Sequence, residues 1–123
     1  MYQKILVREL LSEGQQLLEA LRRNRFVITA AFWHYFSEDL EWRLVIVSPA
    51  VDRSGPLAAY GRVRRAVQSI NPTHLSLSDV TLIGPNDEAY PALRPTISNS
   101  AHFTGTTSAV PFHNFFENYI YQL

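Results

Sequence analysis

The sequence predicts an α+β domain in which a single layer of mostly antiparallel sheet carries two main helices, mainly on one face. Apolar residues recur at helical spacing in two segments, whereas β-branched and aromatic residues gather in two others. The chain has 123 residues, which suffices for one compact domain over 1–123 and not for two full domains. The expected order is helix, strand, strand, helix, strand, loop, strand.

The first helix is expected from Tyr2 to about Arg23. Its apolar stripe repeats at alternating steps of three and four residues, as one face of an amphipathic helix requires. The stripe comprises Val7, Leu10, Gly14, Leu17 and Leu21. Asn24 is suited to end the helix. A glycine within a buried stripe is costly unless a neighbouring element comes close to the backbone, so we predict a tight packing contact at Gly14.

Residues 26–36 and 41–47 are expected to form a β-hairpin, because both segments are rich in β-branched and aromatic residues. With residues 37–40 as the loop, Phe36 lies opposite Glu41 and Ala30 lies opposite Val47. One face of the ribbon then carries Phe26, Ile28, Phe32, Val45 and Val47. The other face carries Trp33, Tyr35, Trp42, Leu44 and Ile46. Because both faces are apolar, something must cover each of them.

The second helix is expected from Pro56 to Ile70, after a turn-rich passage over 49–55. Proline is favoured at the first helical position, and the pair Asn71-Pro72 stops a helix. The expected buried stripe is Leu57, Tyr60, Val63, Val67 and Ile70.

A third strand is expected from Leu75 to Leu82. Its apolar alternation changes parity between Leu77 and Val80, which fits a bulge at Ser78-Asp79. The later segments are expected to be a turn over 84–87, an irregular stretch over 88–111 with one helical turn near 87–93, a short strand over 101–106 and a terminal strand over 119–121.

The composition argues against several classes of protein. There is no cysteine, so disulfides, thiolate zinc sites and thiol nucleophiles are excluded. The formal net charge is zero and the pI is near 6.9, which does not favour nonspecific binding to nucleic acid or to an anionic membrane. No apolar run reaches the length of a membrane span, and no signal peptide is apparent. We expect a cytoplasmic protein without cofactor or metal.

The turn Arg53-Ser54-Gly55 is a candidate anion-binding site, because it delivers an arginine and a hydroxyl to the start of a helix. The simpler interpretation is that Asp52 or Ser54 caps the helix and no ligand binds.

The hairpin tip is a second candidate, since Glu38, Asp39 and Glu41 lie near His34 and Arg43 in the expected register. Carboxylates beside an imidazole can bind a metal or transfer protons. Exposed carboxylates are usually only solvated, however. The histidines of the chain, His34, His74, His102 and His113, show no metal-ligand spacing. We therefore assign no catalytic residue and no metal ligand.

Arginines form a third candidate, because several lie at the end of the first helix and within the second. They are Arg22, Arg23, Arg25, Arg62, Arg64 and Arg65. Such a group could hold the phosphates of RNA or DNA. The neutral total charge and the single lysine argue against nucleic acid as the partner.

These observations favour a noncatalytic protein–protein interaction module, or the small subunit of a bacterial-type assembly, over an enzyme. The excess of aromatic residues predicts a homodimer or a contact with another protein. The expected interface is the sheet face with Trp33, Tyr35, Trp42, Leu44 and Ile46, or the opposite face if the helices cover this one.

The alternative is a small enzyme or nucleic-acid-processing protein that uses the scattered histidines and acidic residues. Two histidines and a carboxylate in one cleft would favour that alternative.

Overall fold

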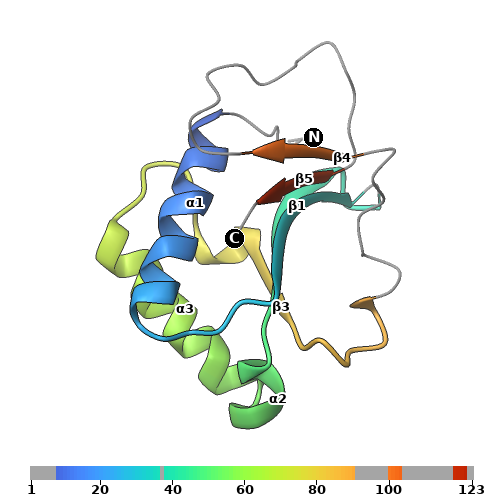
Figure 1. Ribbon diagram of the computed structural model, residues 1–123. Coiled ribbons are helices and arrows are strands. Elements are labelled where there is room, and N and C mark those ends of the chain that lie inside the picture. The colour runs from blue at the N-terminus through green and yellow to red at the C-terminus, as the bar shows by residue number, and fades with distance from the viewer. Residues whose placement is uncertain (1–7, 37, 91–99, 104–117, 122–123) are drawn as a thin grey trace.

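The computed structural model has an α+β fold, with a five-stranded sheet whose helices lie on one side (Figure 1). It describes residues 8–36, 38–90, 100–103 and 118–121, the last two ranges by their backbone. The elements are α1 (Arg8–Arg23), β1 (Ala30–Phe36), β2 (Glu41–Val47), α2 (Ala50–Ser54), α3 (Pro56–Ile70), the 3-10 helix η1 (Leu77–Asp79), β3 (Val80–Ile83), β4 (Ser100–Phe103) and β5 (Asn118–Tyr121). The predicted fold class is confirmed, and the order of elements agrees approximately.

The sheet is mixed, with the strand order β3-β2-β1-β5-β4. β1 pairs antiparallel with both β2 and β5. β3 runs parallel to β2, and β4 runs parallel to β5. The sheet thus has more parallel pairing than the sequence led us to expect. The cause for β3 is the helical connection through α2 and α3, which returns the chain to the end of the sheet where β2 began.

α1 ends at Arg23, as predicted, whereas residues 2–7 of the expected helix lie outside the described residues. The backbone N–H and the side-chain amide of Asn24 both donate to the carbonyl of Ala20, at 3.2 and 2.9 Å. Arg25 follows with a φ of 62°, a left-handed conformation that turns the chain away from the helix axis. Gly14 is buried, as its place on the predicted stripe requires.

The predicted register of the hairpin is confirmed. Phe36 pairs with Glu41 and Ala30 pairs with Val47, with the pairs between them in step. Within the connecting loop, the backbone N–H of Asp39 donates to the carbonyl of Phe36 at 3.1 Å. Leu40 has a φ of 53°, which is rare for a residue with a bulky side chain.

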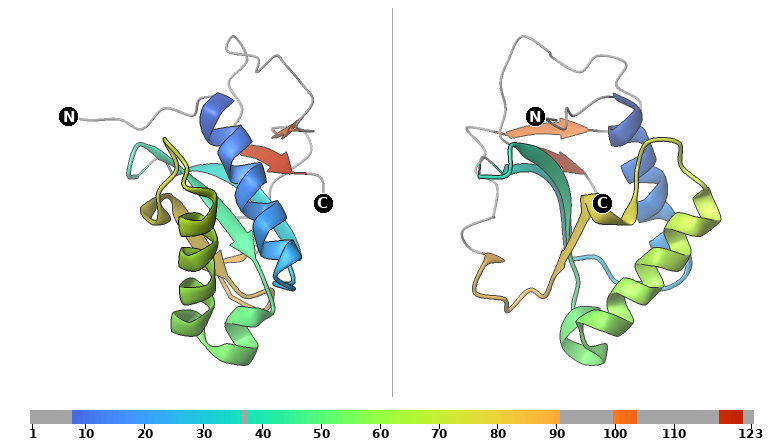
Figure 2. Two further views of the ribbon diagram at one scale, coloured as in Figure 1. Left: turned by 90° about the vertical axis from the view of Figure 1, so that its left-hand side faces the viewer. Right: turned by 180° about the vertical axis from the view of Figure 1, so that it is seen from behind.

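The helices cover the sheet face that carries both tryptophans (Figure 2). Trp33, Trp42, Leu44 and Ile46 are at most 8% exposed and pack with apolar residues of α1 and α3, and Tyr35 packs against the same cluster. Four of the five side chains named above as an interface are therefore core residues of a single chain, and the fifth, Tyr35, is half-buried beside them. The largest side chains of the ribbon gain most from burial, which explains why the helices lie on this face.

The opposite face of the sheet has its own cluster, formed by Phe32, Val45, Val47 and Ile83. These side chains are at most 7% exposed, and Tyr90 packs against them. Phe26 and Ile28, which the sequence placed on this face, belong to the cluster on the helix side instead. Both residues precede β1, so the alternation of a strand does not apply to them.

α3 begins at Pro56 and ends at Ile70, as predicted, and Asn71 closes it with a φ of 47°. Part of the turn-rich passage before it is the short helix α2. The expected cap by Asp52 or Ser54 is wrong, because the N-cap is Gly55 and no side chain caps the helix.

The buried residues of α3 are Ala59, Val63 and Ala66, whereas Leu57 of the expected stripe is 88% exposed. Tyr60, Val67 and Ile70 pack at the margin of the cluster. The two alanines let α3 approach its neighbours closely, so the contact face is rotated from the face with the largest side chains.

The parity change before β3 comes from η1 and not from a bulge, which corrects the expectation at Ser78-Asp79. The carboxylate of Asp79 accepts the backbone N–H of Ser76 at 2.9 Å and closes this single turn. The expected turn over 84–87 is confirmed, since the N–H of Asp87 donates to the carbonyl of Gly84. Among the described residues, no helix is long and apolar enough to cross a membrane.

Candidate functional site

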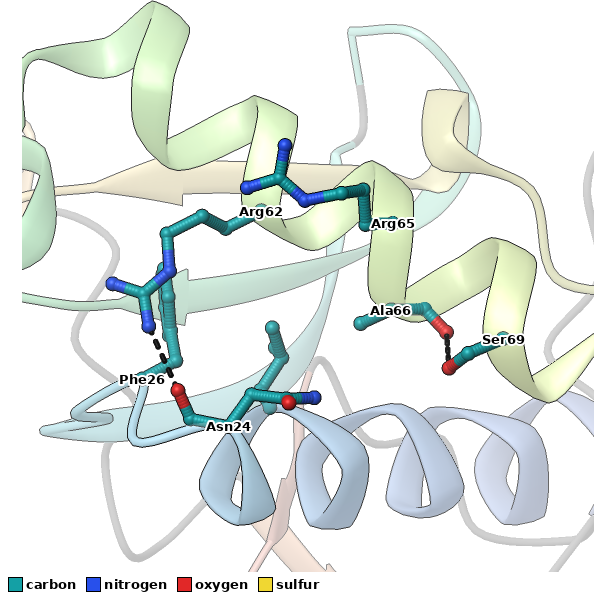
Figure 3. A pocket seen from close by; sticks show the side chains of 7 residues that line it. Asn24, Phe26, Arg62, Arg65, Ala66 and Ser69 are labelled. Atoms are coloured by element: carbon teal, nitrogen blue, oxygen red, sulfur yellow. Dashed lines mark hydrogen bonds between the residues drawn. The ribbon is translucent and has the colours of Figure 1, made fainter.

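A pocket of about 270 Å³ lies where the end of α1 meets the middle of α3 (Figure 3). Its lining residues are Leu21, Asn24, Phe26, Arg62, Arg65, Ala66 and Ser69. We refer to this site as the arginine pocket. α1 supplies its last turn, the turn after α1 supplies Asn24 and Phe26, and α3 supplies the remaining residues. No carboxylate lines the pocket.

The floor of the arginine pocket is apolar. Leu21, Phe26 and Ala66 are between 1 and 3% exposed and belong to the cluster on the helix side of the sheet. The floor therefore offers apolar surface to a group that enters the pocket, without exposing that surface broadly to water.

Arg62 is held in place by two contacts. One of its Nη atoms donates to the carbonyl oxygen of Asn24 at 3.0 Å, and its guanidinium carbon lies 4.9 Å from the centre of the Phe26 ring. A carbonyl beyond the end of a helix lacks an intrahelical donor, so Arg62 satisfies it and offsets the negative end of the helix dipole. Planar guanidinium groups keep further N–H donors available when one is used.

Arg65 lies one turn further along α3 and is exposed. Figure 3 shows its side chain extending back along the helix toward Arg62. Among the described residues, its guanidinium has neither an ion pair nor a hydrogen bond. The hydroxyl of Ser69 donates to the carbonyl of Ala66 at 2.7 Å, so its oxygen is left as an acceptor. Arg65 therefore offers its guanidinium donors to a ligand, beside the remaining donors of Arg62.

The other arginines of the predicted group lie differently. Arg22 and Arg23 line a separate hollow together with Glu19, and Arg25 is exposed in the turn after α1. Arg64 is exposed and does not line the arginine pocket. Because Arg64 is two residues from Arg62 and one from Arg65, it projects from another side of α3.

The predicted anion turn lies elsewhere. Arg53 and Ser54 are exposed at the end of α2, and Gly55 has a φ of 86° between α2 and α3. None of the three lines the arginine pocket. The positive φ explains why glycine stands there, since other residues are strained in that conformation.

At the hairpin tip, the carboxylates of Asp39 and Glu41 face Arg43. Nη2 and Nε of Arg43 lie 2.6 and 2.7 Å from Oε1 of Glu41. The same Nη2 lies 4.0 Å from Oδ2 of Asp39. The ring of His34 lies edge-on to Phe36, with the ring centres 4.8 Å apart. The tip is therefore an ion-paired surface turn, and the described residues hold no group of three possible metal ligands there or elsewhere.

His74 pairs with Glu13 of α1, far along the chain. The Glu13 carboxylate accepts the backbone N–H groups of His74 and Leu75 at 2.8 and 2.9 Å, and its second oxygen lies 2.8 Å from Nδ1 of His74. Burial raises the pKa of Glu13, but the hydrogen bonds from His74 and Leu75 outweigh it and hold the pKa below its ordinary value.

His34 and His74 thus have different partners. The described residues do not bring two histidines and a carboxylate together, whereas His113 and the side chain of His102 lie outside the described part.

The sequence indicates a group of arginines but not the pocket that two of them line. The spacing of Arg62, Arg65, Ala66 and Ser69 places them on one side of a helix and was a usable signal. The contribution of Asn24 and Phe26 depends on how α1 docks against α3, which no local pattern reveals.

Comparison with known proteins found no family model, no curated protein and no solved structure that matches this chain.

Proposed function

We propose that this protein is a noncatalytic interaction module that binds a protein partner in the arginine pocket. The observation that carries the proposal is the combination of an apolar floor with two guanidinium groups and no lining carboxylate. The ligand that fits is an apolar side chain flanked by carboxylates. The same module could be the small subunit of a larger assembly, and we place it in the cytoplasm because a chain without cysteine needs no oxidising compartment.

The apolar floor favours a protein segment over an isolated anion. A phosphate or a lone carboxylate would contact the arginines but would bury no apolar group against the floor of the pocket. Nucleic-acid bases would need an aromatic face on which to stack, and Phe26 is only 1% exposed, with Arg62 over its ring. A side chain of leucine size buries apolar area on the floor while its neighbours reach the arginines.

The expected affinity is modest. Ion pairs near solvent contribute roughly 0.2 to 1 kcal/mol each, and burial of one leucine contributes about 1.5 to 3 kcal/mol. Because part of that gain is offset by the freedom lost on binding, we expect a short peptide to bind weakly and in a salt-dependent manner.

The test is a titration of the protein with the capped tripeptide Glu-Leu-Glu, followed through the backbone amide signals. We expect saturable shifts at Asn24, Phe26, Arg65 and Ser69. The uncharged peptide Gln-Leu-Gln and the peptide Glu-Ser-Glu should each bind more weakly, because one lacks the carboxylates and the other lacks the apolar side chain.

Two variants on α3 distinguish binding in the pocket from nonspecific attraction to positive charge. Arg65→Gln should weaken peptide binding severalfold, whereas Arg64→Gln removes the same charge from another side of the helix and should change it little. Equal effects of the two variants would contradict a site at the pocket. Saturation by inorganic phosphate or a short single-stranded RNA, without any response to Glu-Leu-Glu, would overturn a protein ligand.

A further inference from the structure

We propose that the arginine pocket takes the hairpin tip of a second copy of this chain. The hairpin tip comprises Glu38, Asp39, Leu40 and Glu41. This inference rests on the proposed function, since it names the occupant of the same pocket. It also gives self-association a different surface from the sheet faces, which are buried within one chain at their central positions.

Leu40 is the first observation. It is one of the few large apolar side chains that the described residues leave exposed, at 42%, and it has a φ of 53°. A leucine gains nothing from this conformation, in which glycine or asparagine is favoured, and exposure gives it no burial. Its side chain therefore costs free energy in the isolated chain, and a contact with another molecule would recover part of that cost.

The neighbours of Leu40 match the pocket. Asp39 and Glu41 flank it in the sequence, and Glu38 is exposed next to them. This is the arrangement that the pocket requires, with an apolar side chain between carboxylates. Arg43 offsets part of the charge through Glu41, so the net charge of the tip is negative. The pocket is lined by Arg62 and Arg65, and Arg22 and Arg23 line a separate hollow together with Glu19.

The two surfaces cannot meet within one molecule. The hairpin turn lies at the upper end of the sheet in Figure 1, and the end of α1 lies at the lower end on the other side. Both views of Figure 2 show the same separation. Contact must therefore occur between copies, either reciprocally across a two-fold axis or from head to tail.

The total charge permits such a contact. The formal net charge is zero, so two copies have no net repulsion at neutral pH. Residues 1–70 hold ten basic and seven acidic side chains, and residues 71–123 hold one and four, so local charges of both signs remain. We expect weak association that decreases with salt.

The test is sedimentation velocity of the full chain, at micromolar to millimolar concentrations and at low and high salt. The wild type should associate as concentration rises, and salt should reverse the association. Arg65→Glu and Glu38→Arg should each weaken association about tenfold or more, since each places like charges together. Arg64→Glu and Glu88→Arg serve as matched exposed controls and should behave as the wild type.

Two further variants test whether a loss of association is caused by the changed contact and not by misfolding. The double variant Arg65→Glu with Glu38→Arg exchanges the charges and should regain a large part of the association lost in each single variant. Leu40→Asn should preserve or raise the melting temperature, because asparagine tolerates the left-handed conformation, and should still weaken association.

The outcomes distinguish the two proposals. A wild-type chain that stays monomeric at all concentrations overturns the inference, and if Glu-Leu-Glu still binds in the pocket, the proposed function survives. Association that ignores all these variants also overturns the inference, since it uses another surface. If the wild-type chain stays monomeric and Glu-Leu-Glu does not bind in the pocket, both proposals are overturned.

Discussion

Glu13 connects α1 to the segment after α3 through one carboxylate. Both of its oxygens are used, by two backbone N–H groups and by His74. Its side chain is 12% exposed, so these bonds are shielded from water more than those of a surface ion pair. Nothing in the sequence indicated this role for Glu13, because a contact across 61 residues leaves no local pattern.

Replacing Glu13 by glutamine tests this connection. Glutamine keeps one acceptor and loses the charge, so we expect a loss of about 1 to 3 kcal/mol in the free energy of unfolding at neutral pH. The measurement is urea unfolding, with Glu19→Gln as the control on an exposed position of the same helix. A loss no greater than that of the control would contradict the role of Glu13.

The lowered pKa of Glu13 also predicts how the stabilities of the wild type and of Glu13→Gln change with pH. Because the folded chain holds the pKa of Glu13 below its ordinary value of 4.5, the ionised carboxylate stabilises the fold above that pH. The stabilisation is lost as the pH falls through the lower, folded-state pKa. The difference in stability between wild type and Glu13→Gln should therefore be constant near neutrality and shrink below pH 4.5. A difference that grows on acidification would contradict the sign.

Tyr60 protects the outer edge of the sheet. β3 is an edge strand, and its Leu82 N–H donates to the hydroxyl of Tyr60 at 3.0 Å. Tyr60→Phe keeps the ring and removes the acceptor, so we expect a loss of about 1 to 2 kcal/mol in the free energy of unfolding. The amide of Leu82 should also exchange faster with solvent, which hydrogen exchange measures. Unchanged exchange at Leu82 would show that the hydroxyl does not serve as its acceptor.

At the scale of elements, the sequence predicted what is local and missed what depends on docking. The end of α1, the bounds of α3 and the hairpin register depend on nearby residues such as Asn24, Pro56 and Asn71, and all are confirmed. The face of α3 was misjudged because Ala59 and Ala66 pack inward while Leu57 is exposed. Hydrophobicity alone does not show that small residues are needed where two helices approach.

The parity change before β3 is a second case in which the apolar pattern alone did not identify the local structure. A bulge and a single 3-10 turn both shift the alternation of a strand by an odd step, so the apolar pattern cannot separate them. The pairing of Ser76 with Asp79 decides for the turn. The sequence contained that signal, because an acidic residue three positions after serine is typical of a capped helical turn.

Gly14 gives the prediction that belongs to α1. The residue is buried between Leu10 and Leu17 on the face that packs into the core. Gly14→Leu adds a large side chain at a buried position where we predict a tight packing contact, so we expect a loss of about 1 to 3 kcal/mol in stability despite the better helix propensity of leucine. Thermal unfolding measures the effect, and Gln16→Leu on the exposed side is the control. A melting temperature equal to that of the wild type would mean that space remains at Gly14.

At the scale of the whole molecule, the sheet separates two apolar clusters. The larger lies beneath α1 and α3 and contains both tryptophans, and the smaller lies on the opposite face around Phe32 and Val45. The sequence predicted that both faces are covered, and the central side chains of both are buried. It could not show which face the helices take, because either choice buries apolar residues and only the fit of the large aromatic side chains decides.

The two clusters share the strands β1 and β2, so we expect them to unfold together. Val45→Ala removes buried methyl groups from the face without tryptophan and should cost about 1.5 to 3 kcal/mol. Because a small domain unfolds cooperatively, the transition followed by tryptophan fluorescence should shift as far as the one followed by circular dichroism. Val63→Ala, on the helix side, is the matched variant and should shift both signals in the same way. If Val45→Ala moves the circular dichroism transition but leaves the fluorescence transition in place, the two faces of the sheet are independent units of stability and not one core divided by its strands.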